Sequence, residues 1–263
     1  MSNIQLYNGD CIELMKNIPD GSVDLTVTSP PYDNLRTYNG NIDQWNFEKF
    51  KEIAKELYRV TADGGVVVWI VADATIKGSE TGTSFRQALW FMDCGFNLHD
   101  TMIYAKANPM PCKSKRYTPA FEYMFVFSKG QPKTFNPIME DCKFAGKKSA
   151  RTVIYADGTR KHYNKGFYKD TKVKRNVFEY NVGTGKGRGI KHPAVFPEQL
   201  ANDHIVSWSN EGDVVLDPFS GSGTTHKMAL LNNRRFIGFE ISQEYIDIER
   251  KRLEDCGLWR YDY

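Results

Sequence analysis

A serine, two prolines and a tyrosine follow directly on an apolar run in the segment TVTSPPYDNL, residues 26–35. Neither proline has an N–H to donate to a neighbouring strand, so a strand that ends here must leave its sheet in a rigid bend. A serine hydroxyl and a fixed backbone carbonyl at such a bend are two hydrogen-bond acceptors of preset position. These two acceptors could accept hydrogen bonds from the exocyclic amino group of a nucleobase, and the tyrosine ring could stack on that base.

A second segment, VVLDPFSGSGTT at residues 214–225, reads as a strand, a tight glycine loop and the start of a helix. Gly221 and Gly223 would let a ligand approach the backbone closely. Glu240 ends the next strand 23 residues after Asp217, the spacing of a carboxylate that holds ribose hydroxyls. Asp217 would repel a pyrophosphate but attract an ammonium group. S-adenosylmethionine, with a ribose, a cationic amino-acid end and no phosphate, fits this pattern.

Around these motifs, apolar strands alternate with amphipathic helices. This alternation predicts an α/β fold with a doubly wound, mostly parallel sheet covered by helices on both faces. In such sheets ligands bind beyond the carboxyl ends of the strands, where both motifs fall. Strands are expected at residues 4–10, 22–29, 66–72, 99–106, 121–129, 213–217 and 234–240, helices at 11–17, 47–59, 84–94, 197–209, 224–232 and 244–256, and a turn at 63–65.

The charge is unevenly distributed along the chain. The net charge is +3, yet residues 143–191 hold 14 Lys or Arg against three acidic residues, a net of +11, and the remainder carries −8. A charge run of this kind is often only a solvated loop. Here tyrosines and phenylalanines are interleaved with the cations, which suits phosphate contact and base stacking. The segment is therefore predicted to be an insert that binds nucleic acid.

Other features narrow the class of protein. No apolar stretch approaches the length of a membrane span, and the first residues lack a signal-peptide pattern. The five cysteines are scattered and form no CxxC pair, which argues against a disulfide framework or a zinc site. A cytoplasmic protein with reduced thiols and no bound metal is expected. The glycine cluster at 183–189 is not a Walker loop, because Tyr180 stands where its first glycine is needed.

TSPPY together with DPFSGSGTT resembles the DNA amino-methyltransferases that modify cytosine N4 or adenine N6. The catalytic motif precedes the cofactor motif, which resembles the beta group of that family. The resemblance implies a Rossmann-like, seven-stranded fold that uses S-adenosylmethionine and acts on a base flipped out of the duplex. It divides the chain into a catalytic half at 1–140, a basic target-recognition insert at 141–190 and a cofactor-binding half at 191–263.

The resemblance also assigns expected roles to single residues. The catalytic set is Ser29, Pro30, Pro31 and Tyr32. The cofactor-binding set is Asp10, Cys11, His192, Asp217, Pro218, Phe219, Gly221, Gly223, Thr224, Thr225 and Glu240, with Glu240 on the ribose and Asp10 near the adenine ring. Within the insert, the candidates for DNA contact are Arg151, Arg160, Lys161, Lys174 and Arg175.

Ser29 bears on which base is modified. Family members with Ser at this position mostly methylate cytosine N4, and those with Asp mostly methylate adenine N6, so the resemblance favours cytosine N4. Adenine N6 is the alternative, and an RNA substrate stays open. A non-catalytic nucleic-acid-binding protein is a third reading, which the intact motifs oppose. Double-stranded DNA is the expected partner; a homodimer and a separately acting restriction endonuclease are further partners that the resemblance implies.

Overall fold

The computed structural model describes residues 4–31, 45–112, 115–182 and 197–259, with only the backbone of residues 164 and 165. The chain forms two compact units. One comprises residues 1–136 and 176–263 and is called the α/β unit below; the other comprises residues 137–175 and is called the basic unit. The basic unit holds 11 Lys or Arg against four acidic residues. The predicted insert at 141–190 therefore overlaps a separate structural unit, and its role in target recognition stays a prediction.

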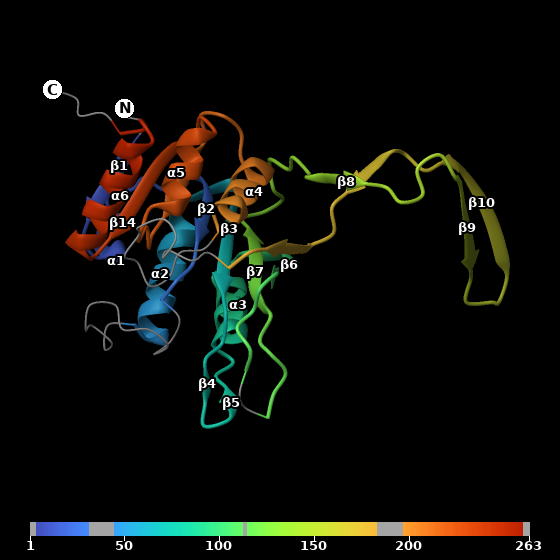
Figure 1. Ribbon diagram of the computed structural model, residues 1–263, viewed down its shortest axis with the longest axis horizontal. Helices are drawn as coiled ribbons and strands as arrows, with labels where there is room; N and C mark the ends of the chain where they lie inside the picture. Colours follow the sequence, from blue (N-terminus) through green and yellow to red (C-terminus); the bar gives the residue numbers. More distant parts are fainter. Residues whose placement is uncertain (1–3, 32–44, 113–114, 183–196, 260–263) are drawn as a thin grey trace. The chain divides into compact units, whose positions relative to one another are not determined.

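The α/β unit is built on a sheet with the strand order β1-β14-β13-β2-β3-β7-β6-β12 (Figure 1). Neighbouring strands pair in parallel, except that β7 runs antiparallel to both β3 and β6. The predicted doubly wound, mostly parallel sheet is confirmed. Its strands are β1 (Ile4–Asn8), β2 (Val23–Thr28), β3 (Thr61–Val71), β6 (Asn97–Lys106), β7 (Phe121–Ser128), β12 (Val177–Tyr180), β13 (Val214–Asp217) and β14 (Arg235–Glu240).

Two details of the sheet differ from the expectation. The described residues give it eight strands instead of seven, because β12 adds in parallel to β6 at the edge. The turn expected at residues 63–65 lies inside β3, where the pairing with β2 jumps from Thr61 to Val66. Gly64 has a φ of 76° and donates its N–H to the Lys129 carbonyl at 2.7 Å, so this stretch is an irregularity within a longer strand.

Helices cover both faces of the sheet (Figure 1). The first three helices pack on one face around Phe50, Trp69 and Phe91, which are all fully buried. On the other face α4 contacts β2, α5 contacts β13 and β14, and α6 contacts β1 and β14. The helices are α1 (Cys11–Met15), α2 (Phe47–Val60), α3 (Thr83–Asp93), α4 (Glu198–Trp208), α5 (Thr224–Leu231) and α6 (Gln243–Asp255); the short strands β4 (Thr75–Ile76) and β5 (Ser79–Glu80) precede α3.

Local sequence explains where these elements begin. The Asn46 side chain accepts a hydrogen bond from the Lys49 N–H at 2.9 Å and caps α2, whose apolar residues then recur at helical spacing toward the core. Gly82 cannot cap α3 with a side chain, and the carboxylate of Asp73 instead accepts from the Ser84 N–H at 3.0 Å. The continuous apolar run of β3 is buried, as a central strand requires.

The direction in which successive strands are added to the sheet reverses between β13 and β2. The strand that follows β13 in the chain, β14, lies on one side of this pair, and the strand that follows β2, β3, lies on the other. The five strands from β1 to β3 in the sheet order are parallel, so their carboxyl ends share one edge of the sheet. The topological switch point of such a sheet is where ligands bind. Both sequence motifs lie at this point. Among the described residues, no helix has the length and apolarity needed to cross a membrane.

The basic unit consists of two antiparallel strand pairs, which the sequence analysis did not predict. The strand β8 (Met139–Asp141) pairs with β11 (Thr171–Val173), and β9 (Lys148–Ile154) pairs with β10 (Arg160–Phe167). Between β9 and β10 the chain turns at Gly158, where φ is 80°. The Asp157 carboxylate accepts from the Thr159 N–H at 2.9 Å and stabilises this turn.

Candidate active site at the carboxyl ends of the sheet

Asp217, the last residue of β13, joins the two motifs. Its Oδ1 accepts a hydrogen bond from the Thr28 hydroxyl at 2.6 Å and one from the Phe219 N–H at 3.0 Å. A second tie runs from the Thr225 hydroxyl to the Val27 carbonyl at 3.1 Å. Because Thr28 immediately precedes Ser29, these bonds fix the serine–proline bend beside the glycine loop.

Asp217 is only 1% exposed. Burial raises its pKa to about 7, although the hydrogen bonds from Thr28 and Phe219 favour the charged form; the nearby charge of Glu249 adds to the rise. A cation held close to this carboxylate would lower its pKa and be attracted to it. The expected pairing of Asp217 with a ligand ammonium group stays a prediction, since its Oδ1 already serves two protein donors.

Glu240, at the end of β14, holds the loop from the neighbouring strand. Its two oxygens accept from the Gly221 N–H at 2.9 Å and the Ser242 N–H at 2.8 Å. Burial raises the pKa of Glu240, although these two hydrogen bonds favour the charged carboxylate. The side chain is partly exposed, and each carboxylate oxygen has a further lone pair. Glu240 can therefore accept two ribose hydroxyls without giving up its hold on the loop.

Asp10 lies one strand further along the same edge, since the Gly9 N–H donates to the Glu240 carbonyl at 2.9 Å. One of its oxygens caps α1 by accepting from the Ile12 N–H, and the other lies 2.7 Å from the Lys49 ammonium group. Burial raises the pKa of Asp10, but the hydrogen bonds from Lys49 and Ile12 outweigh it and leave the pKa below its usual value. Three carboxylates thus stand at consecutive strand ends, which suits a ligand with a ribose and a cation and no phosphate.

The other residues predicted for the catalytic and cofactor sites differ in burial. Pro30 and Pro218 are buried beside their motifs, and Ser29 and Pro31 are partly exposed. Tyr32 and His192 lie outside the described residues, so their expected contacts stay predictions. Burial, with the adjacent charge of Asp10, raises the pKa of the Cys11 thiol to about 12, and the thiol is therefore neutral. Phe219 packs edge-on against Trp45 with ring centres 5.5 Å apart, and Gly221, Gly223, Thr224 and Thr225 are buried.

The sequence analysis did not predict the charged side chains of α6 that hold the glycine loop. Glu249 of α6 is fully buried and accepts from the Ser220 hydroxyl, 2.7 Å from each of its oxygens. Its Oε1 also lies 2.7 Å from Nδ1 of His226, whose ring stacks on Phe236. A Cβ on Gly223 would come within 2.5 Å of the Glu249 Cγ, so this loop position requires glycine.

Arg252, three residues further along α6, holds the other side of the loop. It donates to the Ser222 carbonyl at 2.8 Å and the Thr224 hydroxyl at 3.1 Å. It also donates to Glu198 at the start of α4 at 2.6 Å. We call Glu249 and Arg252 the α6 clamp. Their spacing places them on one helix face, but α6 is rich in charged residues and nothing in its sequence marks that face as buried.

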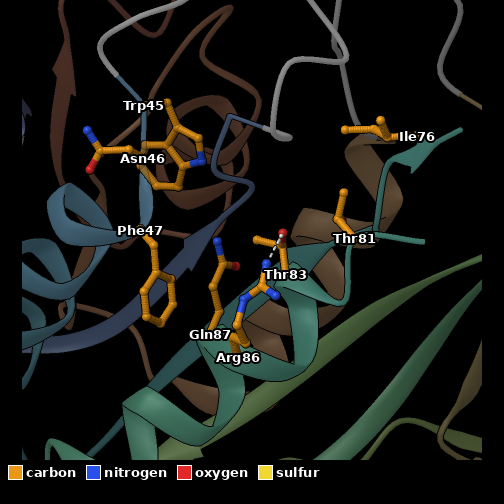
Figure 2. A pocket seen from close by; sticks show the side chains of 8 residues that line it. All are labelled: Trp45, Asn46, Phe47, Ile76, Thr81, Thr83, Arg86 and Gln87. Atoms are coloured by element: carbon orange, nitrogen blue, oxygen red, sulfur yellow. Dashed lines mark hydrogen bonds between the residues drawn. The ribbon is translucent and has the colours of Figure 1, made fainter. Parts of the chain in front are cut away.

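A cavity of about 270 Å³ lies between the start of α2 and the start of α3 (Figure 2). Trp45 and Phe47 form an aromatic side, and Arg86 and Gln87 of α3 project into the cavity. Gln87 is 1% exposed, and its Oε1 accepts from the Trp69 indole N–H at 2.8 Å. Trp69 is the β3 partner of Thr28, so the cavity lies near the end of β2.

The candidates for DNA contact all lie in the basic unit. Arg151 is on β9, Arg160 and Lys161 are on β10, and Lys174 and Arg175 follow β11. Arg175 is strongly exposed, with its Nε 3.9 Å from Glu140. Within the part of the chain that the structure describes, no three His, Cys, Asp or Glu side chains are placed to hold a metal ion.

Comparisons with known proteins agree with this architecture. A protein-family model described as DNA methylase, for N6 and N4 methyltransferases, matches residues 23–251. The chain is 54% identical over 251 residues to the orphan methyltransferase M.BamHII of Bacillus amyloliquefaciens, with 92% of each chain covered. It is 29% identical to the DNA adenine methyltransferase YhdJ of Escherichia coli, covering 95% of this chain and 82% of YhdJ.

Solved structures give the same fold. The cytosine-N4-specific PvuII DNA methyltransferase superposes with a TM-score of 0.70 at 24% identity, covering 95% of this chain and 86% of the other. The M1.HpyAVI–S-adenosylmethionine complex superposes with a TM-score of 0.65 at 25% identity, covering 95% and 98%.

Proposed function

The chain belongs to the N6/N4 DNA methylase family, and from this premise we propose that it transfers a methyl group from S-adenosylmethionine to the N4 amino group of a cytosine in double-stranded DNA. The observation that carries the proposal is the joint between the two motifs. The Thr28–Asp217 hydrogen bond of 2.6 Å places the serine–proline bend next to the glycine loop. An acceptor amine and a methyl donor can therefore meet at one strand edge.

Ser29 and Pro30 act on the acceptor. S-adenosylmethionine supplies an electrophilic methyl group at this site. The lone pair of an exocyclic amine is delocalised into its base, which makes the nitrogen a poor nucleophile. The Ser29 hydroxyl and the Pro30 carbonyl accept hydrogen bonds from its two N–H groups and favour a tetrahedral nitrogen with a localised lone pair. Because the prolines restrict the backbone, these acceptors are in place before the base arrives.

The cofactor side is supplied by the three strand-end carboxylates. Glu240 accepts the ribose hydroxyls, Asp10 lies near the adenine ring, and Asp217 with the glycine loop faces the cationic amino-acid end. The buried Cys11 thiol takes no covalent part, because its pKa of about 12 keeps it neutral.

The cavity of Figure 2 suits the base itself. Aromatic rings of Trp45 and Phe47 offer stacking surfaces, and the exposed Arg86 guanidinium offers hydrogen-bond donors to ring acceptors. The target base must leave the duplex to reach such a cavity. We assign the cavity to the acceptor side of the reaction.

The choice of cytosine rests on Ser29. The relatives of the chain include an adenine enzyme, so adenine N6 is the alternative outcome. The test is nucleoside mass analysis of mixed-sequence duplex DNA after incubation with the protein and S-adenosylmethionine. N4-methylcytosine is the expected product. N6-methyladenine would refute the base assignment and leave the site geometry in place. No methylated base in DNA would contradict the proposal itself, and the same assay on RNA would then identify the polymer.

A further inference from the structure

The strands β9 and β10 form a two-stranded ribbon, called here the β9–β10 ribbon. Its register pairs Arg151 with Tyr163 and Lys161 with Val153. Side chains alternate between the two faces of a strand, so residues two apart share a face. One face, called the tyrosine face, carries Arg151, Val153, Tyr155, Lys161 and Tyr163. The opposite face, called the histidine face, carries Thr152, Ile154, Arg160 and His162.

Side-chain contacts show that Tyr155, Lys161 and Tyr163 lie on the same face of the ribbon. The hydroxyl oxygens of Tyr155 and Tyr163 lie 3.1 Å apart, and the Lys161 ammonium group lies 5.4 Å from the centre of the Tyr163 ring. Each tyrosine is thereby held next to a cation or a second hydroxyl. The face presents guanidinium, ammonium and phenol groups together, which offers several donors and two acceptors over a short distance.

The histidine face is poorer in free polar groups. The Thr152 hydroxyl and His162 Nδ1 lie 2.8 Å apart and satisfy each other. Ile154 is 64% exposed and offers no hydrogen bond. Its described cations are Arg160, beside the turn, and Lys148, at the other end of β9. Arg160 is suited to a phosphate, while the tyrosine face is suited to a surface with its own pattern of donors and acceptors.

The ribbon also has the charge and size of a groove ligand. Residues 148–167 hold five Lys or Arg against one Asp. Its two strands lie about 4.8 Å apart, and the DNA major groove, about 12 Å wide, admits a two-stranded ribbon. Exposed aromatic and basic side chains on so small an element bury little within the protein. Polyanionic DNA complements them in charge, and this complementarity identifies the occupant.

We propose that the β9–β10 ribbon enters the major groove of double-stranded DNA with its tyrosine face toward the base edges, and that Arg151 reads a guanine there. This inference rests on the proposed function, because it concerns the same DNA substrate. Arg151 and Tyr155 are separated by about 13 Å along the strand, so the face spans about four base-pair steps. Arg160 contacts the sugar–phosphate backbone.

The test selects bound sequences from a randomised duplex library with the full-length wild-type chain, Arg151→Ala and Arg160→Ala. Both variants remove one exposed arginine from the same ribbon, so each is the other's control. For Arg151→Ala we expect a loss of about tenfold or more in preference at one base pair. For Arg160→Ala we expect uniformly weaker binding, an unchanged sequence preference and a salt-dependence slope smaller by about 0.9.

A methylation-interference experiment with dimethyl sulfate tests the groove. Modification of guanine N7, in the major groove, should block wild-type binding at the position that Arg151→Ala no longer selects. Interference confined to adenine N3, in the minor groove, would overturn the proposal, as would a changed preference in Arg160→Ala or an unchanged one in Arg151→Ala. A wild-type chain without any sequence preference would also overturn it. Binding selection needs no methyl transfer, so a failure of the cytosine assignment would be seen separately, in the nucleoside analysis.

Discussion

The glycine loop and the β9–β10 ribbon both belong to the proposed machinery, yet they are built in opposite ways. The loop is buried, and side chains from β14 and α6 hold it through hydrogen bonds to Ser220, Gly221 and Ser222. The ribbon has exposed side chains on both faces and hydrogen bonds mainly to itself. A loop fixed in advance orients a small cofactor without a further ordering cost, whereas a ribbon that packs against little protein leaves its side chains available to DNA.

The largest effect should come from Ser29→Ala, which removes an acceptor at the bend and no packing. We expect kcat to fall by about 100-fold or more, because one preorganised hydrogen-bonding group is lost from the reacting amine. Calorimetric affinity for S-adenosylmethionine should stay at the wild-type value. Ser22→Ala, just before the other end of β2, makes the same substitution at a partly exposed serine and is the matched control, which should keep its turnover. Full activity of Ser29→Ala would remove this hydroxyl from the chemistry.

Glu249→Gln should show how much the fastened loop depends on the α6 clamp. A neutral amide cannot accept equally from Ser220 and His226, so we expect a loss of about 2 kcal/mol in the free energy of unfolding. Affinity for S-adenosylmethionine should fall about tenfold at a temperature where the variant is folded. The exposed Glu254→Gln on the same helix is the control and should change neither value. Wild-type affinity in Glu249→Gln would mean that the loop keeps its shape without the clamp.

Asp217→Asn should change how stability depends on pH. The folded pKa of about 7 lies above the reference value of 3.8, so the folded state holds the proton more tightly. The contribution of Asp217 to stability is therefore fully present below about pH 4 and is lost as the pH rises through about 7. Asparagine keeps an oxygen for Thr28 and Phe219 and has no charge to bury. The variant should gain stability over the wild type at pH 8 relative to pH 5 in urea unfolding, and an unchanged difference would contradict the raised pKa.

The double variant Lys174→Glu, Arg175→Glu should weaken DNA binding and leave the fold unaffected. We expect affinity for duplex DNA to fall about tenfold, with a salt-dependence slope smaller by about 2, because two phosphate contacts are lost. The melting temperature should stay close to the wild-type value. An unchanged slope in a titration against salt would place the DNA surface outside this segment.

The smallest effect should come from a matched pair of hydroxyl deletions. Ser220→Ala removes a buried hydroxyl that donates a hydrogen bond to Glu249. Tyr163→Phe removes an exposed hydroxyl that lies next to the Tyr155 hydroxyl. We expect a loss of about 1.5 kcal/mol of unfolding free energy for the first and less than about 0.5 kcal/mol for the second. Equal losses of unfolding free energy in the two variants, measured by urea unfolding, would contradict the contrast between a buried, fastened loop and an exposed ribbon.

The sequence predicted the parts of the site that depend on local pattern. The strand before Asp217, the loop glycines and the strand that ends at Glu240 are each visible in a few consecutive residues. The α6 clamp is different, because Glu249 and Arg252 look like ordinary charged residues of an amphipathic helix. Only the packing of α6 against the loop, through contacts 29 and 30 residues apart in the chain, buries them. Tertiary contacts of this kind have no period in the sequence.

The errors in the sheet have similar causes. The strand β12 is short and lies within the segment whose charge predicts a single insert, although its apolar residues Phe178 and Tyr180 are buried at the edge of the sheet. Gly64 and Gly65 indicate a break, but β3 continues past them because Gly64 pairs with Lys129 of the segment after β7. In both cases a long-range pairing overrides a local signal.

The bond between Thr28 and Asp217 spans 189 positions of the chain. At roughly 5 to 20 residues per second, a ribosome takes roughly 10 to 40 seconds to add that length. During this interval β2 has no β13 beside it, and one edge of an apolar strand stays open to other chains. The cofactor site is completed last, when α6 emerges. Nascent chains should therefore be inert toward cofactor, and dependent on protection from aggregation, until the ribosome has released α6.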